Sequence, residues 1–375
     1  MNRMCVVATV LLVMVVLTAD VYAQRVLVSY NVVPGLRSVV VFRGHNNNMY
    51  LVGWDVSSTP YKLVLYNLNT SSSSVVFTCD KAGYVVGGDG YAYAVCNKDL
   101  YRIPDLVKIY SFYSMPYFVF FDHYSNVLIA FINAGFGTDV FVVDVLRREA
   151  RNYGFLNWFI YGFGANADYY YTIQYNAVNW WLVSYTKDFS RVVRNITIDK
   201  PLASNTTLTR YSAFAVNDLA VVVLFDGYTI VYDRHLNVIR NVSRGFVRIE
   251  STKYHFYGYD SGFNVYCVSP TGYVYPVDVD GLTYFSMVGS YLYRVDLGVV
   301  YNDSLGVVYI VESPNDIALV VVTTTTTIAL PVYVTKTVTV TTTTYAFQPE
   351  APIAIALFFA LLLIVAAIVF ILKKK

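Results

Sequence analysis

The sequence predicts an all-β protein whose main domain is a β-propeller, and three observations support that fold class. Apolar residues come in short bursts rich in Val, Ile, Tyr and Phe, bounded by Gly, Asn, Asp or Pro, which is typical of strands. Similar bursts recur along the chain at intervals that suit propeller blades. Between the two chain ends, the sequence contains no convincing amphipathic helix.

Each repeat contains a short run of apolar and aromatic residues followed by a polar turn. One residue of each run serves as the anchor for aligning the repeats. The anchors are Tyr66, Tyr101, Val143, Tyr185, Tyr232, Tyr266 and Tyr293. Their mean spacing, about 38 residues, lies in the range of four-stranded blades. Because the last spacing is too short for a blade, we expect seven blades, with the N-terminal strand Arg25–Tyr30 completing the last one. The alternatives are six blades with extra strands, or two β-sandwich domains that divide near residue 200.

The N-terminal residues 1–23 predict a signal peptide. Arg3 supplies a basic start, Met4–Leu17 is an apolar run, and Ala23 provides the small residue expected at a cleavage site. We therefore expect cleavage after Ala23 and export of an ectodomain that spans residues 24–322.

The C-terminal end predicts a stalk, a membrane anchor and a short tail. The Thr-rich residues 323–350 are typical of an extended, O-glycosylated stalk, with an extra strand docked on the ectodomain as the alternative. Within residues 351–372, the run Ile353–Leu372 lacks polar side chains and would span about 30 Å as a helix, enough to cross a bilayer. Lys373–Lys375 marks the cytoplasmic side, so we expect a single-pass protein with its N-terminus outside.

Five Asn-x-Ser/Thr sequons agree with an exported chain and predict N-glycosylation. The asparagines concerned are Asn69, Asn195, Asn205, Asn241 and Asn302. Ordinary turn chemistry is the alternative explanation, because Asn, Ser and Thr are common turn residues.

Cysteines and aromatic residues supply the remaining candidate sites. Cys79 and Cys96 flank a strong turn signal and are expected to form a disulfide outside the cytoplasm. Cys267 is the odd cysteine, either buried as a small hydrophobic residue or paired with one of the other two. The chain contains 36 tyrosines, most of which we expect to pack between blades. A cluster that could instead bind a glycan or a partner protein comprises Tyr169, Tyr170, Tyr171, Trp180 and Trp181.

The sequence contains no recognisable signature of catalysis or of cofactor binding. The histidines have no metal-ligand spacing, and neither a phosphate-binding loop nor a nucleophile elbow is present, so we expect no cofactor and no metal. Basic residues are scattered and the net charge is +2, which argues against nucleic-acid binding. Propeller enzymes draw catalytic residues from separate blades, so an extracytoplasmic hydrolase or lyase acting on polysaccharide or peptide is the alternative hypothesis.

The order of the segments resembles that of membrane-anchored surface glycoproteins of archaea or of viruses that infect them. The residues that carry this resemblance are Thr323–Thr327, Thr341–Thr344, Ile353–Leu372 and Lys373–Lys375. The resemblance concerns architecture and assigns no functional residue. It implies a glycoprotein of a cell or envelope membrane whose ectodomain serves recognition, adhesion or surface structure, with the membrane and a glycan or surface protein as partners.

Overall fold

The chain divides into two compact units, Met1–Ser313 and Pro314–Lys375. The computed structural model describes residues 26–88, 90–156, 158–202, 213–277, 286–287, 297–302, 305–312, 320–327 and 339–346. The predicted signal peptide (residues 1–23) and the predicted membrane span (residues 351–372) lie outside the described residues. Within the described part of the chain, no helix is long and apolar enough to cross a bilayer.

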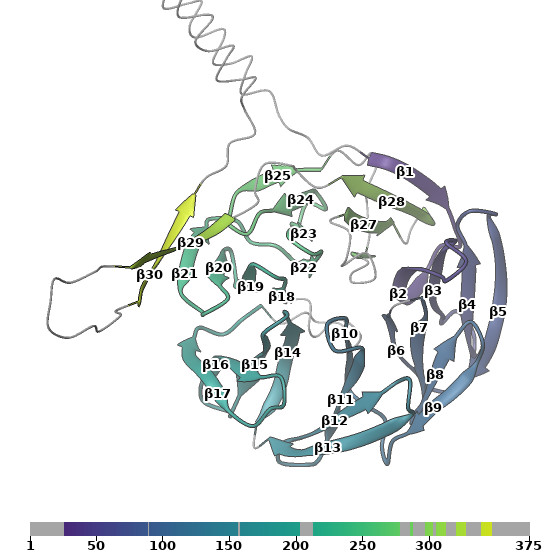
Figure 1. Ribbon diagram of the computed structural model, residues 1–375. Coiled ribbons are helices and arrows are strands. Elements are labelled where there is room, and N and C mark those ends of the chain that lie inside the picture. Colours follow the sequence, from purple (N-terminus) through teal and green to yellow (C-terminus); the bar gives the residue numbers. More distant parts are fainter. Residues whose placement is uncertain are drawn as a thin grey trace, which may run out of the picture. The chain divides into compact units, whose positions relative to one another are not determined.

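The first unit is a seven-bladed β-propeller, as the sequence predicts (Figure 1). In blades 1 to 6, four consecutive strands pair antiparallel in chain order, from the innermost strand to the outermost. Blade 1 contains β2 (Leu36–Arg43), β3 (Met49–Asp55), β4 (Tyr61–Asn67) and β5 (Ser72–Cys79); blade 2 contains β6 (Ala82–Gly87), β7 (Ala92–Cys96), β8 (Asp99–Ile103) and β9 (Val107–Ser111). Blade 3 contains β10 (Phe118–Asp122), β11 (Val127–Asn133), β12 (Thr138–Asp144) and β13 (Glu149–Leu156); blade 4 contains β14 (Phe159–Ala165), β15 (Tyr169–Tyr175), β16 (Trp180–Thr186) and β17 (Val192–Ile198). Blade 5 contains β18 (Phe214–Val216), β19 (Ala220–Leu224), β20 (Thr229–Asp233) and β21 (Val238–Val242); blade 6 contains β22 (Arg248–Ser251), β23 (Phe256–Tyr259), β24 (Val265–Val268) and β25 (Val274–Pro276).

The seventh blade closes the ring with both ends of the domain. It contains β26 (Ser286–Met287), β27 (Leu297–Asn302), β28 (Val307–Glu312) and, as its outermost strand, β1 (Val26–Asn31). The N-terminal strand therefore completes the last blade, which confirms the predicted closure and rules out two β-sandwich domains. Tyr293 lies outside the described residues, but the anchor expected there is wrong, because the third strand of this blade is β28. Tyr309 on β28 restores a blade-length spacing from Tyr266.

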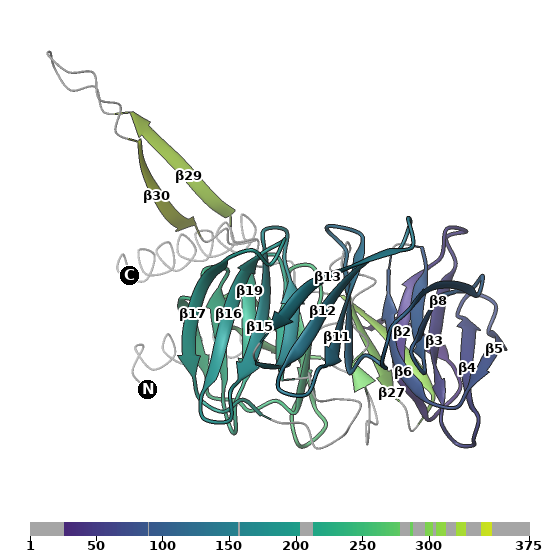
Figure 2. The same cartoon turned by 90° about the horizontal axis from the view of Figure 1, so that it is seen from below.

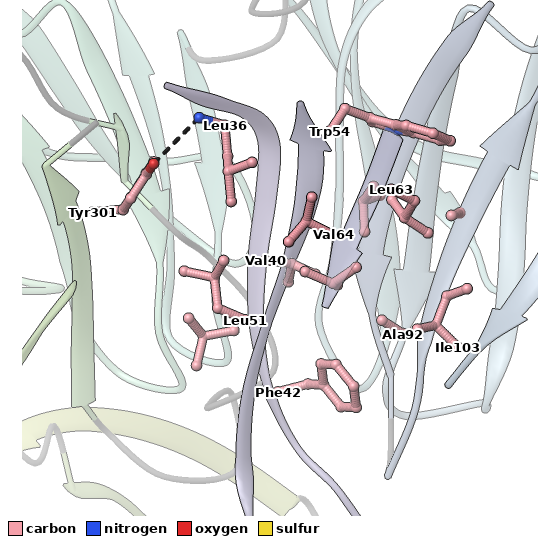
Figure 3. Close-up of a cluster of buried hydrophobic side chains, with 14 of the residues drawn as sticks. Leu36, Val40, Phe42, Leu51, Trp54, Leu63, Val64, Ala92, Ile103 and Tyr301 are labelled. Carbon is pink, nitrogen blue, oxygen red and sulfur yellow. Dashed lines mark hydrogen bonds between the residues drawn. The ribbon is translucent and has the colours of Figure 1, made fainter. Parts of the chain in front are cut away.

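The hydrophobic core lies between neighbouring blades. Central strands such as β19 are buried along their whole length because each face of the sheet packs against another blade. Figure 3 shows the cluster around blade 1, where Leu36, Trp54 and Leu63 are buried and the Tyr301 hydroxyl of blade 7 accepts a hydrogen bond from the Leu36 amide. The short Val-rich and Tyr-rich bursts form strands because branched and aromatic side chains fill such two-sided interfaces well.

The antiparallel order of the strands gives the ring two distinct faces. Turns between the second and third strands lie on the same face as the connections between blades, and turns between the first and second and between the third and fourth strands lie on the other. We call the former the connection face. Figure 2 shows the strands of blades 3 and 4 from the side, with turns at both ends.

The second unit contains a two-stranded antiparallel sheet in the Thr-rich segment. Strand β29 (Val320–Thr327) pairs with β30 (Thr339–Ala346) in a register that runs from Val320 opposite Ala346 to Thr327 opposite Thr339. The described part of the segment is therefore a paired ribbon, and not the unpaired extended chain expected from composition. β-Branched residues favour strands, and here the tract supplies its own partner.

Candidate functional site

The predicted aromatic cluster is separated into two parts by the hairpin that carries it. Strands β15 and β16 pair so that Tyr175 faces Trp180 and Tyr169 faces Thr186. Tyr169 lies at the far end of the hairpin, about six residues from Tyr175, a separation of roughly 20 Å along a strand. Adjacency in sequence therefore does not bring Tyr169, Tyr170 and Tyr171 together with Trp180 and Trp181 at one site.

Tyr170 and Tyr171 are buried and connect blades. The Tyr171 hydroxyl donates a hydrogen bond of 2.7 Å to the Arg234 carbonyl oxygen of blade 5, and the Tyr170 hydroxyl donates one of 2.9 Å to Asp122 Oδ2 of blade 3. Burial raises the pKa of both tyrosines, and the Asp122 charge adds to the effect at Tyr170. These two residues therefore contribute packing between blades and expose almost no surface to a ligand.

A buried ionic cluster lies at the same junction of blades 3 and 4. Lys187 Nζ lies 2.8 Å from Asp122 Oδ2 and 4.3 Å from the centre of the Tyr170 ring. Burial lowers the pKa of Lys187, and the Asp122 charge opposes that shift. Asp122 is completely buried, so the cluster holds two blades together without presenting a carboxylate to a substrate.

Exposed apolar residues instead occur at two turns on the connection face. Phe136 in the β11–β12 turn is 93% exposed, and Val178 in the β15–β16 turn is 77% exposed. Asn133 accepts a hydrogen bond from the Gly135 amide, and Asn176 accepts hydrogen bonds from the amides that follow it, at Val178 and Asn179. Each turn is thus braced by an Asn side chain and carries an apolar residue at its tip.

A row of aromatic residues crosses blade 4 beside the Val178 turn. Phe159 pairs with Tyr175, which pairs in turn with Trp180. The Tyr175 and Trp180 rings stack with centroids 4.3 Å apart, and Tyr161 packs edge-on against Trp180. We call the set Phe136, Phe159, Tyr175, Val178 and Trp180 the rim.

The turns that carry Phe136 and Val178 differ from the exposed turn at Leu146 in their lack of charge. The turns that carry Phe136 and Val178 contain Asn, Ala, Gly and Val but no acidic or basic residue. On the opposite face, Leu146 is 73% exposed but is followed by Arg147 and Arg148, which keep that turn charged. Charged residues are depleted at the centres of protein interfaces, so the rim is a surface of blades 3 and 4 that is suited to binding.

Three of the sequon asparagines that the structure describes lie in outer parts of their blades. Asn69 is exposed in the β4–β5 turn, and Asn195 and Asn241 are exposed on the outermost strands of blades 4 and 5. Asn302 is the last residue of β27, and Asn205 lies outside the described residues.

Cys79 and Cys96 form a disulfide, with Cα atoms 5.8 Å apart. Cys79 ends the outermost strand of blade 1, and Cys96 ends the second strand of blade 2. The bond therefore links two blades, whereas the sequence pattern suggested two strands of one hairpin. Cys267 is buried and lies outside this disulfide.

The described residues assemble no group of three or more His, Cys, Asp or Glu side chains that could hold a metal ion. On the innermost strand of blade 6, Glu250 is paired with Arg248 at 2.8 Å. The structure indicates no enzyme family.

Of the rim residues, sequence reasoning identified Trp180 but missed Phe136, Phe159, Tyr175 and Val178. Phe136 has a local signal that could have found it: a large apolar residue between Gly135 and Gly137, in a turn too short to bury it. Val178 has a weaker one, because Asn residues flank its turn on both sides.

Solved propeller structures resemble the fold of this chain. The WD40 propeller domain of Doa1 is 13% identical with a TM-score of 0.51, covering 78% of this chain and 98% of that one. The Cps50 (Swd1) propeller domain of Myceliophteria thermophila is 9% identical with a TM-score of 0.52, covering 78% and 100%, and a chain of the Mitotic Checkpoint Complex is 10% identical with a TM-score of 0.51, covering 78% and 96%. The chain matches no family model and no curated protein. At these identities, the likeness shows the fold alone.

Proposed function

We propose that this protein is a non-enzymatic recognition module, displayed outside a membrane, that binds the apolar surface of a partner protein through the rim. The observation that carries the proposal is the pair of braced turns that present Phe136 and Val178 to solvent on neighbouring blades. Together with the aromatic row beside the Val178 turn, these residues form exposed apolar surface of the kind that marks protein interaction sites.

The shape of the rim favours a protein over a sugar as the ligand. Phe136 and Val178 are at the tips of turns, so they can enter pockets on a partner, as interface anchors do. Because each turn is braced by an Asn side chain, little conformational entropy is lost when the tip is immobilised.

Display outside the membrane is supported by the sequence at the chain ends. The predicted signal peptide, Thr-rich segment, apolar run and lysine tail together would hold the propeller on the outer side of a cell or envelope membrane. Antibody labelling of intact cells that make the full chain tests this part separately, and labelling that requires permeabilised cells would contradict it.

The binding experiment compares variants of the full chain displayed on cells. Fragments of surface proteins from cells of the same source are offered to the wild type, to Phe136→Ser, to Val178→Ser and to the matched control Leu146→Ser. Loss of one anchor should weaken binding about thirtyfold, the equivalent of about 2 kcal/mol, while the control should bind like the wild type. Equal losses in all variants would contradict the role of the rim. Binding to glycans in a parallel glycan array, together with no binding to any of the protein fragments, would contradict the proposal that the partner is a protein.

A further inference from the structure

Asn195 and Asn241 occupy equivalent positions on neighbouring blades. Asn195 on β17 pairs with Val183, and Asn241 on β21 pairs with Ile230. Each asparagine follows an arginine next to a bulge in the outermost strand of its blade. Both are exposed, because the faces of the outermost strands separate from the neighbouring blade towards the circumference of the ring.

Each of these asparagines has an aromatic side chain beside it on the same face of the sheet. Trp181 faces Thr197, the hydroxyl residue of the sequon that begins at Asn195. Trp181 is therefore a diagonal neighbour of Asn195, about 7–8 Å away across the strands. On blade 5, Tyr228 immediately precedes β20, two residues before the Ile230 that pairs with Asn241, and both Tyr228 and Ile230 pack against the same hydrophobic cluster. The Tyr228 hydroxyl donates a hydrogen bond to Asp199 Oδ2.

The aromatic surface at Asn195 is extended by a second tryptophan. Trp158 packs against Trp181 with ring centroids 5.3 Å apart, and Trp158 is 37% exposed. The Trp181 ring is half-buried among residues of blades 3 and 4, which leaves the rest of this apolar surface open to solvent. Asn69 differs, since it lies in the β4–β5 turn outside a strand, where its side-chain oxygen accepts a hydrogen bond from the Met49 amide.

We propose that N-glycans on Asn195 and Asn241 fold back over Trp181 and Tyr228 and stabilise the outer edges of blades 4 and 5. The C–H face of a sugar ring packs on an aromatic ring and removes apolar surface from water. The donor is a lipid-phosphate-linked oligosaccharide. A bond forms between Asn Nδ2 and sugar C1 as the bond from C1 to the phosphate oxygen breaks. Nδ2 gives its proton to a base of the glycosyltransferase, and the lipid phosphate leaves with the electron pair of the broken bond. The proposal goes beyond recognition at the rim and shares with it only the requirement that the chain is exported.

The test uses the full chain purified in detergent from a host that performs N-glycosylation. Mass spectrometry first establishes the occupancy of Asn195. Thr197→Ala removes the sequon without changing Asn195, Thr197→Ser keeps it, and Ser71→Ala removes the sequon of Asn69 as the matched control. Thr197→Ala should lower the melting temperature by about 2 °C, as expected for a modest contact in a domain of this size, while Thr197→Ser and Ser71→Ala should leave it unchanged.

A second comparison separates sugar contact from ordinary packing. Trp181→Phe should destabilise the protein more in the glycosylated background than in the Thr197→Ala background, and acrylamide should quench tryptophan fluorescence more after enzymatic trimming of the glycan. An unmodified Asn195, equal effects of Trp181→Phe in both backgrounds, or unchanged quenching would each overturn the proposal. None of these variants alters Phe136 or Val178, so binding at the rim can fail or succeed independently.

Discussion

Lys187 of blade 4 forms an ion pair with Asp122 of blade 3, with 2.8 Å between Nζ and Oδ2. The Asp122 carboxylate also accepts hydrogen bonds from the Tyr170 hydroxyl and the Tyr124 amide. These contacts satisfy a charge that is completely buried, and they do so with groups from two blades. Their loss should therefore weaken the blade junction as a whole.

Lys187→Met should lower the free energy of unfolding by about 3 kcal/mol, because it leaves the buried Asp122 carboxylate without its cation. The double variant Asp122→Asn with Lys187→Met should cost less than the sum of the single changes. Urea unfolding of the full chain in detergent measures both. Arg234→Met is the matched control, because its 3.5 Å pair with Asp168 is exposed and should contribute less than about 1 kcal/mol. A larger loss in the control than in Lys187→Met would contradict the importance of burial.

Removal of the Cys79–Cys96 disulfide should destabilise the domain by about 3 kcal/mol. The bond closes a segment with a sequence separation of 17 residues, and a closed loop of that length restricts the unfolded chain accordingly. The double variant Cys79→Ser with Cys96→Ser should unfold at lower urea, and added reductant should shift the wild type but not the variant. A Cys267→Ala protein should still respond to reductant, since Cys267 is outside the bond. An unchanged midpoint in the double variant would contradict the prediction.

The fold could be predicted from sequence because each blade repeats the same local pattern, whereas the site depends on tertiary packing. Tyr171 and Trp180 are both large aromatics on one hairpin, yet Tyr171 packs inside the blade junction and Trp180 is half-buried at the connection face. Alternation along a strand assigns residues to two faces of a sheet, but in a propeller both faces are covered near the axis and open near the circumference. The Tyr293 anchor failed for a related reason: its sequence fits the repeat locally, but strand β28 supplies the third strand of that blade.

Tyr301→Phe should weaken the contact between blade 7 and the segment before blade 1, and so lower the free energy of unfolding. The Tyr301 hydroxyl of blade 7 donates a hydrogen bond of 2.7 Å to the Val33 carbonyl oxygen and accepts one from the Leu36 amide, across the segment that joins β1 to β2. Its removal leaves buried backbone groups without this partner and should cost about 1–3 kcal/mol in urea unfolding. Tyr66→Phe removes an exposed hydroxyl that donates to the Ser71 carbonyl oxygen, and it should cost much less. Equal losses in the two variants would argue against a special role for the closure contact.

Stability should fall as the pH rises above about 10. Burial raises the pKa of Tyr117 to about 12 and that of Tyr232 to about 12, and it also raises the pKa of Tyr170 and Tyr171. In the unfolded chain these phenols ionise near pH 10, so the folded state holds more protons above that pH. The free energy of unfolding then decreases with pH, by up to about 1.4 kcal/mol per pH unit for each such tyrosine. Burial lowers the pKa of Lys187, so this residue makes the free energy of unfolding rise with pH. It is a single group, and the four tyrosines outweigh it.

Urea midpoints between about pH 9 and about pH 12, followed together with phenolate absorbance, test this dependence. Phenolate from the buried tyrosines should appear only as the protein unfolds. Tyr117→Phe should make the free energy of unfolding fall less steeply between about pH 10 and about pH 12, by up to about 1.4 kcal/mol per pH unit, which is the contribution of one tyrosine. Tyr117 also shares a 2.7 Å hydrogen bond with the Thr138 hydroxyl, so Tyr117→Phe lowers stability at every pH. The quantity to compare is therefore the slope of the free energy of unfolding against pH. Full ionisation of all tyrosines while the propeller remains folded would contradict the prediction, because it would mean that the blade junctions admit phenolate without cost.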